Sequence, residues 1–171
     1  MVSEIEMALL EQFAFGEIGE QDFIESYPVN LLNNKNYLIN LIEVMIKNKD
    51  ADNLSLLLDV IASLSLYKDY DIQSVYRKLI KVNWHQMHEE LVDSLDKSAV
   101  NEDYFIYVLN SLYDYHKDGV EDFMVPIWSK CLWSLYKIKT RKSIDMIKQY
   151  VNSEYEYLRE TSKKNLSKLN E

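Results

Sequence analysis

The chain has few of the residues that sharp turns and catalytic loops require. Its 171 residues include only three glycines and two prolines. β-Sandwiches and βαβ units need such residues at many turns, so both fold classes are disfavoured. The sequence also lacks a Gly-rich phosphate loop and a Gly-x-Ser-x-Gly nucleophile elbow. Long helices joined by short polar links fit better, and 47% apolar residues are enough to build a core.

Disulfides, an export signal and a membrane span are not expected either. The single cysteine, Cys131, cannot form an internal disulfide, which suits the reducing cytoplasm. Glu4 and Glu6 stand where an export signal would be basic and then apolar. The most apolar run, residues 54–67, is too short to span a bilayer and contains Asp59. We therefore expect a cytoplasmic protein with no membrane partner.

Basic residues are also scarce, and the formal net charge is −9. Residues 1–26 hold seven acids and no base, whereas residues 123–171 hold ten bases and five acids. Phosphate binding depends on Lys and Arg, so nucleic acid is not an expected partner. An acidic chain instead attracts basic proteins and speeds their encounter.

Apolar residues recur at helical spacing along nearly the whole chain. Ile5, Leu9 and Phe13 mark the first helix, and the helix at 21–26 should stop before Pro28. Further helices are expected in pairs: 36–48 with 52–66, 71–82 with 85–96, 102–115 with 123–138, and 141–151 with 154–169. This period of about 30–40 residues is typical of two-helix solenoid repeats. An irregular helical bundle is the alternative.

Several of these helices predict buried stripes. One stripe is Trp84, His88, Leu91, Val92 and Leu95, and another is Ile127, Trp128, Cys131, Leu132 and Leu135. Trp133 and Tyr136 lie on another side of the second helix, which predicts that this helix is packed between neighbours. Ser153 is the expected N-cap of the last helix.

We expect no metal, no cofactor and no catalytic residues. His85, His88 and Glu89 do not match the helical zinc signature, in which two histidines lie four residues apart. The simpler interpretation is a core histidine at 88 and a pair between His85 and Glu89 one turn later. Cys131 falls on a buried stripe, whereas reactive thiols need exposure and a cationic partner. The protein is therefore not expected to be an enzyme.

The best candidate for function is the acidic, tyrosine-rich segment between two helices. Tyrosine is enriched at interface hot spots, and carboxylates can pair with Arg or Lys. A solvated acidic loop is the plain alternative. A second cluster occupies an earlier loop between helices, and in a solenoid the two would share one edge. The predicted partner-binding residues are Asp69, Tyr70, Asp71, Tyr113, Asp114, Tyr115, Asp118, Glu121 and Asp122.

Several sequence elements carry a resemblance to a known family. They are Trp84-His85, His88-Glu89 and Val92, then Asp114-Tyr115, then Lys130-Cys131 with Trp133 and Leu135, and the segment 19–29. With these elements the chain resembles HEAT-like bacterial immunity proteins encoded beside polymorphic toxins of the contact-dependent and Rhs kinds. The resemblance implies that the Trp-His-x-x-His-Glu run is scaffold, because proteins facing different toxins would share framework residues.

Together these observations predict an all-α solenoid of about 8–10 helices in HEAT-like antiparallel pairs. It would form a single domain over residues 1–171, with a helical hairpin cap at 1–30. The resemblance implies an immunity protein that binds a cognate toxin C-terminal domain, one to one as a monomer, and occludes its basic, nuclease-type active site. A helical-repeat adaptor with a non-toxin partner is the alternative. A HEAT-like DNA-repair enzyme is a third, but the acidic charge opposes it.

Overall fold

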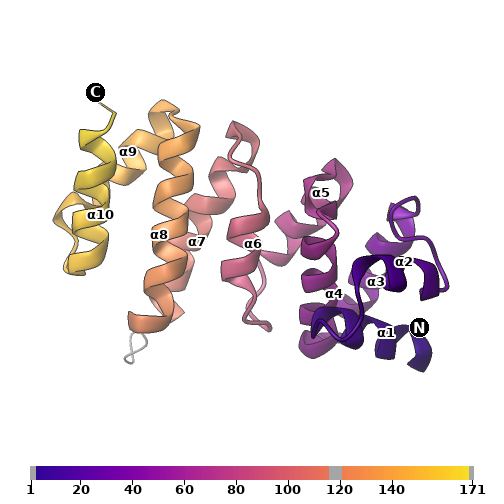
Figure 1. Cartoon of the computed structure of the whole chain (residues 1–171). Helices are drawn as coiled ribbons and strands as arrows, with labels where there is room; N and C mark the ends of the chain where they lie inside the picture. Colours follow the sequence, from indigo (N-terminus) through magenta and orange to yellow (C-terminus); the bar gives the residue numbers. More distant parts are fainter. Residues whose placement is uncertain (1–2, 116–120, 170–171) are drawn as a thin grey trace. The chain divides into compact units, whose positions relative to one another are not determined.

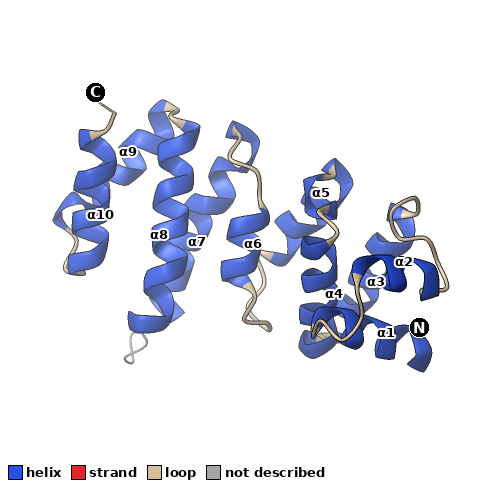
Figure 2. Ribbon diagram, in the orientation of Figure 1, coloured by secondary structure: helices blue, strands red, loops and turns tan. Residues whose placement is uncertain are grey.

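The computed structural model describes the backbone of residues 3–115 and 121–169, and within these ranges the side chains outside 111–123. Every regular element in these ranges is helical, as Figure 2 shows, so the all-α prediction is confirmed. The described residues form ten α-helices and three short 3₁₀-helices, in agreement with the predicted number. None of the described helices has both the length and the apolar character needed to cross a lipid bilayer.

The chain divides into two compact units, residues 1–87 and 88–171. The helices of the first unit are α1 (Glu4–Ala14), α2 (Glu20–Ser26), α3 (Lys35–Asn48), α4 (Ala51–Ser63), η1 (Leu66–Lys68) and α5 (Tyr70–Leu79). The helices of the second unit are α6 (His88–Ser94), η2 (Ala99–Asn101), α7 (Glu102–Tyr115), α8 (Glu121–Ile138), α9 (Arg141–Gln149), η3 (Tyr150–Asn152) and α10 (Glu156–Ser167). A single domain over 1–171 stays a prediction.

The first unit opens with a helical hairpin. Ser3 caps α1 in a capping box: its hydroxyl accepts the Glu6 N–H at 3.3 Å, and the Glu6 carboxylate accepts the Ser3 N–H at 2.7 Å. α1 packs on α2, and the rings of Phe13 and Phe23 stack with centroids 4.5 Å apart. The two helices predicted for residues 1–30 are therefore in contact, and their role as a hairpin cap stays a prediction.

Local sequence sets where the next helices begin and end. α2 stops at Tyr27, whose backbone is extended (φ −71°, ψ 132°), as expected for a residue that precedes proline. Asn34 and Asp50 accept backbone N–H groups from the first turns of α3 and α4, so these helices start at capping residues. α4 packs against α1 and α3, and it buries residues on more than one side: Leu54, Leu57, Leu58, Val60 and Ile61. α4 is therefore the central helix of the first unit.

Within the second unit, α8 is the central element. It packs against α6, α7, α9 and α10, and Figure 1 shows α6 and α10 on either side of it. Its predicted stripe is buried as expected: Ile127, Trp128, Cys131, Leu132 and Leu135 are each at most 2% exposed. Helix α8 therefore organises the core of this unit through an almost continuous apolar face.

Two predicted helix starts are wrong. The helix expected at 85–96 begins at His88 and ends at Ser94, because hydrogen bonds of the His85 ring to nearby backbone hold the preceding residues outside the helix. Ser153 is not the N-cap of the last helix, which starts after Tyr155. The Ser153 hydroxyl instead accepts the N–H of Tyr155, the residue just before the helix, at 3.2 Å.

Candidate partner-binding surfaces

The first predicted cluster, Asp69–Asp71, lies where η1 passes into α5. Asp69 is the N-cap of α5, and its carboxylate accepts the Asp71 N–H at 2.8 Å. Partial burial alone would raise the pKa of Asp69, but this backbone bond and the ammonium of Lys35 lower it overall. Asp69 thus has a structural role that the sequence also signals, because an aspartate just before a helix is a typical cap.

Lys35 neutralises part of this cluster. Its ammonium lies 3.2 Å from the Asp69 carboxylate and 2.9 Å from the Asp71 carboxylate, and these hydrogen bonds, that of Asp71 first, raise the pKa of Lys35. The ammonium group and both carboxylates lie at the surface, so the pairs contribute little to stability. Lys35 therefore balances the charge of one of the two carboxylates, and Arg77 on α5 adds a second cation beside the cluster.

Tyr70 is the most exposed member of the cluster. Its side chain is 73% exposed at the first position of α5. The guanidinium of Arg77, two turns later on the same helix, lies over the Tyr70 ring at 5.6 Å from the centroid. The cluster therefore presents an exposed aromatic ring between two carboxylates.

The second predicted cluster, at 113–122, is only partly described. Tyr113, Asp114 and Tyr115 are the last residues of α7, and Glu121 and Asp122 are the first residues of α8. The expectation of a loop carrying all six residues is therefore wrong, since the helices extend into the segment. Asp118 lies outside the described residues, as do the side chains of the other five.

The two predicted clusters belong to different units. Asp69, Tyr70 and Asp71 lie in the first unit, whereas residues 113–122 lie in the second. Their union into one continuous acidic surface stays a prediction.

The histidines at 85 and 88 are both buried, at 4% and 7% exposure. His85 Nδ1 accepts the Met87 N–H at 3.2 Å, so the ring proton resides on Nε2, which donates to the Leu79 carbonyl at 3.0 Å. Both ring nitrogens are thus engaged by backbone. Burial lowers the pKa of His85. Across the described residues, no three His, Cys, Asp or Glu side chains gather in a way that could hold a metal ion.

The pair between His85 and Glu89 stays a prediction. Glu89 pairs with the Lys130 ammonium on α8, at 2.8 Å. The prediction placed His85 and Glu89 on consecutive turns of one helix, but that helix begins only at His88. The burial of His88 agrees with its interpretation as a core histidine.

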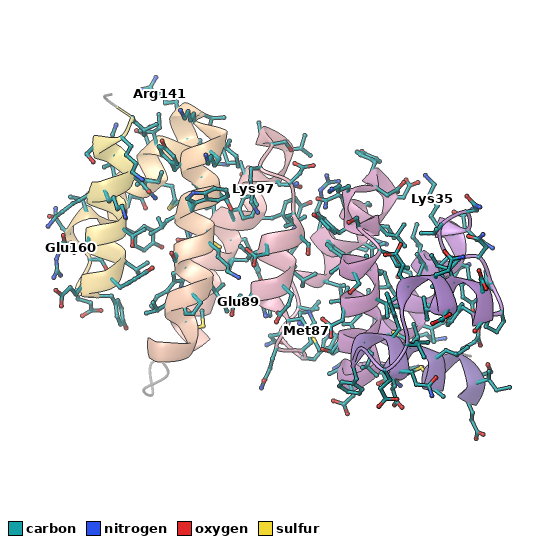
Figure 3. All side chains as sticks on the ribbon, in the orientation of Figure 1. Lys35, Met87, Glu89, Lys97, Arg141 and Glu160 are labelled. Carbon is teal, nitrogen blue, oxygen red and sulfur yellow. The ribbon has the colours of Figure 1, made fainter. Side chains whose placement is uncertain are left out.

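Cys131 is completely buried in the core of the second unit. Burial raises the pKa of its thiol far above the usual range, although the nearby Lys97 ammonium acts in the opposite direction. Lys97 (labelled in Figure 3) is itself occupied, because its ammonium donates to the Val92 carbonyl at 2.7 Å and to the Leu95 carbonyl at 2.8 Å. Cys131 therefore behaves as a small apolar core residue, as the sequence predicted.

Sequence reasoning missed a surface groove between α6 and α8. We call it the α6–α8 groove: it has a volume of about 290 Å³ and is lined by Asp93, Ser129, Lys130, Trp133 and Ser134. Helix α8 is packed between neighbours, as predicted, but Trp133 is 47% exposed, so the neighbouring helices do not cover this residue. The signal for this groove was present, since Trp133 falls off the buried stripe and Glu89 and Asp93 lie one turn apart.

A second, more polar hollow lies between α7 and the segment that contains η3. Its volume is about 440 Å³, and its lining consists of Asn110, Gln149, Tyr150, Asn152, Ser153 and Glu154. The Tyr150 hydroxyl lies 3.2 Å from the side-chain oxygen of Asn110. This contact ties the two walls together.

Comparisons of the chain with models of protein families, with curated proteins and with solved structures found no match.

Proposed function

We propose that this chain is an immunity protein that binds and neutralises a basic bacterial toxin domain. The observation that carries the proposal is Tyr70, which is 73% exposed between two carboxylates on a chain of net charge −9. An exposed tyrosine contributes a large contact area at low entropic cost, and carboxylates beside it accept Arg or Lys donors. The choice of a toxin as the partner rests on the resemblance of the 84–138 pattern to HEAT-like immunity proteins.

The scaffold of this proposal is a solenoid of HEAT-like helix pairs. Packing within the second unit supports it: α8 lies against its partner α7 and also against α6 and α10, as a helix in a stack of pairs does. Consecutive pairs would align their loops along one edge. The Asp69–Asp71 cluster and residues 113–122 would then present their negative charge to one face of the toxin.

Inhibition would be by occlusion of the toxin's active site in the cytoplasm. Attraction between the acidic chain and a basic toxin would speed encounter, and carboxylate–Arg pairs around tyrosine anchors would slow release. Protection requires roughly nanomolar binding, about −12 kcal/mol. An interface of about 1,600 Å² can supply this if its anchors are well packed. The chain itself would act by binding rather than by catalysis, as a monomer in a 1:1 complex.

Co-expression with the product of the neighbouring reading frame, followed by pull-down, tests the proposal. A 1:1 complex that suppresses the toxicity of that product supports it. A stable complex with a harmless partner would instead favour an adaptor. Association measured against ionic strength tests the electrostatic part, since a rate that does not fall with salt contradicts steering.

The interface can be tested with matched sets of substitutions. Replacing Asp114, Asp118 and Asp122 together with Ala should weaken protection without unfolding the protein. The control set, Asp145, Glu156 and Glu160 to Ala, removes the same charge from exposed positions on α9 and α10. Equal losses from the two sets would show that only total charge matters and that residues 113–122 are not the contact.

A further inference from the structure

Helix α10 docks on the second unit through a largely polar face. Figure 1 shows it beside α8, against which it packs. The buried residues of α10 are Leu158, Ser162 and Asn165, which are spaced four and three positions apart and therefore share one side of the helix. Only one of these three side chains is apolar, whereas α8 buries a whole apolar stripe. Burial of apolar surface therefore stabilises the docked position of α10 much less than it stabilises α8.

The two polar residues of this face carry buried atoms that form no hydrogen bond. Ser162 is 0% exposed and Asn165 is 5% exposed. Neither the Ser162 hydroxyl oxygen nor the Asn165 side-chain nitrogen has a hydrogen-bond partner in the described part of the chain. Water would supply such partners if the helix moved away, so the docking of α10 costs the hydration of both groups.

Two contacts near the start of α10 tie it to α8. The Tyr157 hydroxyl donates to the Ser129 hydroxyl at 3.0 Å, in an exposed position. The ring of Tyr155, just before the helix, lies 5.3 Å from the ring of Trp128, which is 2% exposed. Tyr155 occupies the N-cap position, but its side chain makes no capping hydrogen bond, so α10 lacks the stabilisation that a capping residue gives.

We propose that α10 is a lid, which undocks as a whole helix while α8 and the rest of the second unit stay folded. In the open state water hydrates Ser162 and Asn165, and the side of α8 that carries Trp128 is uncovered. The exposed bond between Tyr157 and Ser129 opposes this movement weakly, because water can replace it. The chain can thus expose an apolar part of α8 without unfolding the core around it.

The lid does not depend on the proposed immunity function. Every residue that carries it lies between positions 128 and 165, and its opening requires no partner. Loss of the lid would leave the proposed toxin binding untouched, and failure to find a toxin would leave the lid untouched.

Native-state hydrogen exchange of the full chain, followed by NMR at low concentrations of urea, tests the lid. The amides of residues 160–166 should exchange through one shared opening, with protection about 100-fold lower than that of residues 128–136 in α8. The indole N–H of Trp128 should exchange together with the α10 amides. Equal protection of the two helices, or an indole that exchanges with α8, would overturn the proposal. So would protection that falls steadily towards residue 167, which is the pattern of a fraying chain end.

The variant Ser162→Ala with Asn165→Leu removes both unpaired groups and makes the buried face of α10 apolar. Protection of the α10 amides should rise about tenfold or more, because the closed lid no longer buries polar atoms without partners. The control variant, Lys164→Leu with Ser167→Ala, alters exposed positions of the same helix. It shares the gain in helix propensity and should change protection by less than about threefold. Equal gains from the two variants, or no gain from the buried pair, would overturn the proposal.

Discussion

Ser143 donates its hydroxyl to Glu102 across 2.5 Å, and both side chains are buried. Thr140, the N-cap of α9, donates to the same carboxylate. One carboxylate thus ties the first residue of α7 to the first turn of α9. A buried acid is stable only when its oxygens are hydrogen-bonded, and here two hydroxyls supply the donors.

Glu102→Ala should destabilise the protein by about 1–3 kcal/mol, because the buried Ser143 hydroxyl and the partly buried Thr140 hydroxyl lose their acceptor. Thermal unfolding followed by circular dichroism measures the loss. Asp103→Ala is the control: Asp103 is the next residue, is 73% exposed and pairs only at the surface with Lys142. Its replacement should cost less than about 1 kcal/mol. Equal costs at the two positions would contradict the role assigned to Glu102.

Glu6 should make the first unit sensitive to acid. Burial tends to raise the pKa of Glu6, but hydrogen bonds from the Tyr37 hydroxyl and from Ser3 lower it below the ordinary value of 4.5. A lowered folded-state pKa means that the stabilisation is complete above pH 4.5 and is lost as the pH falls through the folded pKa. Unfolding temperatures measured from pH 7 to about 2 should therefore fall less steeply below pH 4.5 for Glu6→Gln than for the native protein. Parallel curves for the two proteins would contradict this assignment.

His85 should act in a separate, higher pH window. Burial lowers its pKa below the ordinary value of 6.5, so the unfolded chain binds a proton more readily than the folded one. The contribution of His85 to stability should then be complete above pH 6.5. It should be lost progressively as the pH falls from 6.5 towards the folded-state pKa. An NMR titration of the His85 ring gives the folded pKa directly. His85→Asn should make stability less dependent on pH between pH 7 and about 5. A folded-state pKa at or above 6.5 would contradict a neutral His85 ring with both nitrogens hydrogen-bonded.

Cys131 should resist thiol reagents in the native protein. Its side chain is fully buried, and burial raises the pKa of the thiol, so little thiolate forms at neutral pH. Reaction with a disulfide reagent should be slow in buffer and rapid in denaturant. A Val100→Cys variant, with its new thiol at a position 64% exposed, should react at once and serves as the control. Rapid native reaction at Cys131 would show that the core of the second unit opens readily.

The positions of most helices could be predicted from the sequence. Apolar spacing placed α3, α4, α7 and α8, because a helix that packs against others must repeat its apolar residues about every 3.6 positions. The boundary of α6 was mispredicted. Trp84 and His85 fit the spacing of the helix that follows them, but the ring of His85 bonds backbone groups that a longer helix would displace.

The candidate site was less predictable than the fold. Asp69, Tyr70 and Asp71 could be selected as an acidic, aromatic cluster, but Asp69 proves to be a helix cap and Lys35, 34 residues earlier, neutralises part of the charge. The α6–α8 groove was missed, since it depends on an ion pair between residues 37 apart in the chain, Asp93 and Lys130. Such pairs depend on which helices pack together, and local sequence patterns do not predict that packing.

Composition and periodicity by themselves determined that this chain is all-helical, acidic and rich in buried apolar faces. Few glycines and prolines disfavour folds with many sharp turns, and the helical spacing of apolar residues indicates helices. Only the tertiary structure decided which polar groups are buried. Ile5 is 69% exposed while Glu6 beside it is 8% exposed, since Tyr37 and Ser3 supply the hydrogen bonds that make burial of a carboxylate tolerable. Trp133 stays exposed because the helices that pack around α8 cover the other faces of that helix. Its aromatic ring therefore remains at the surface beside Asp93 and Lys130.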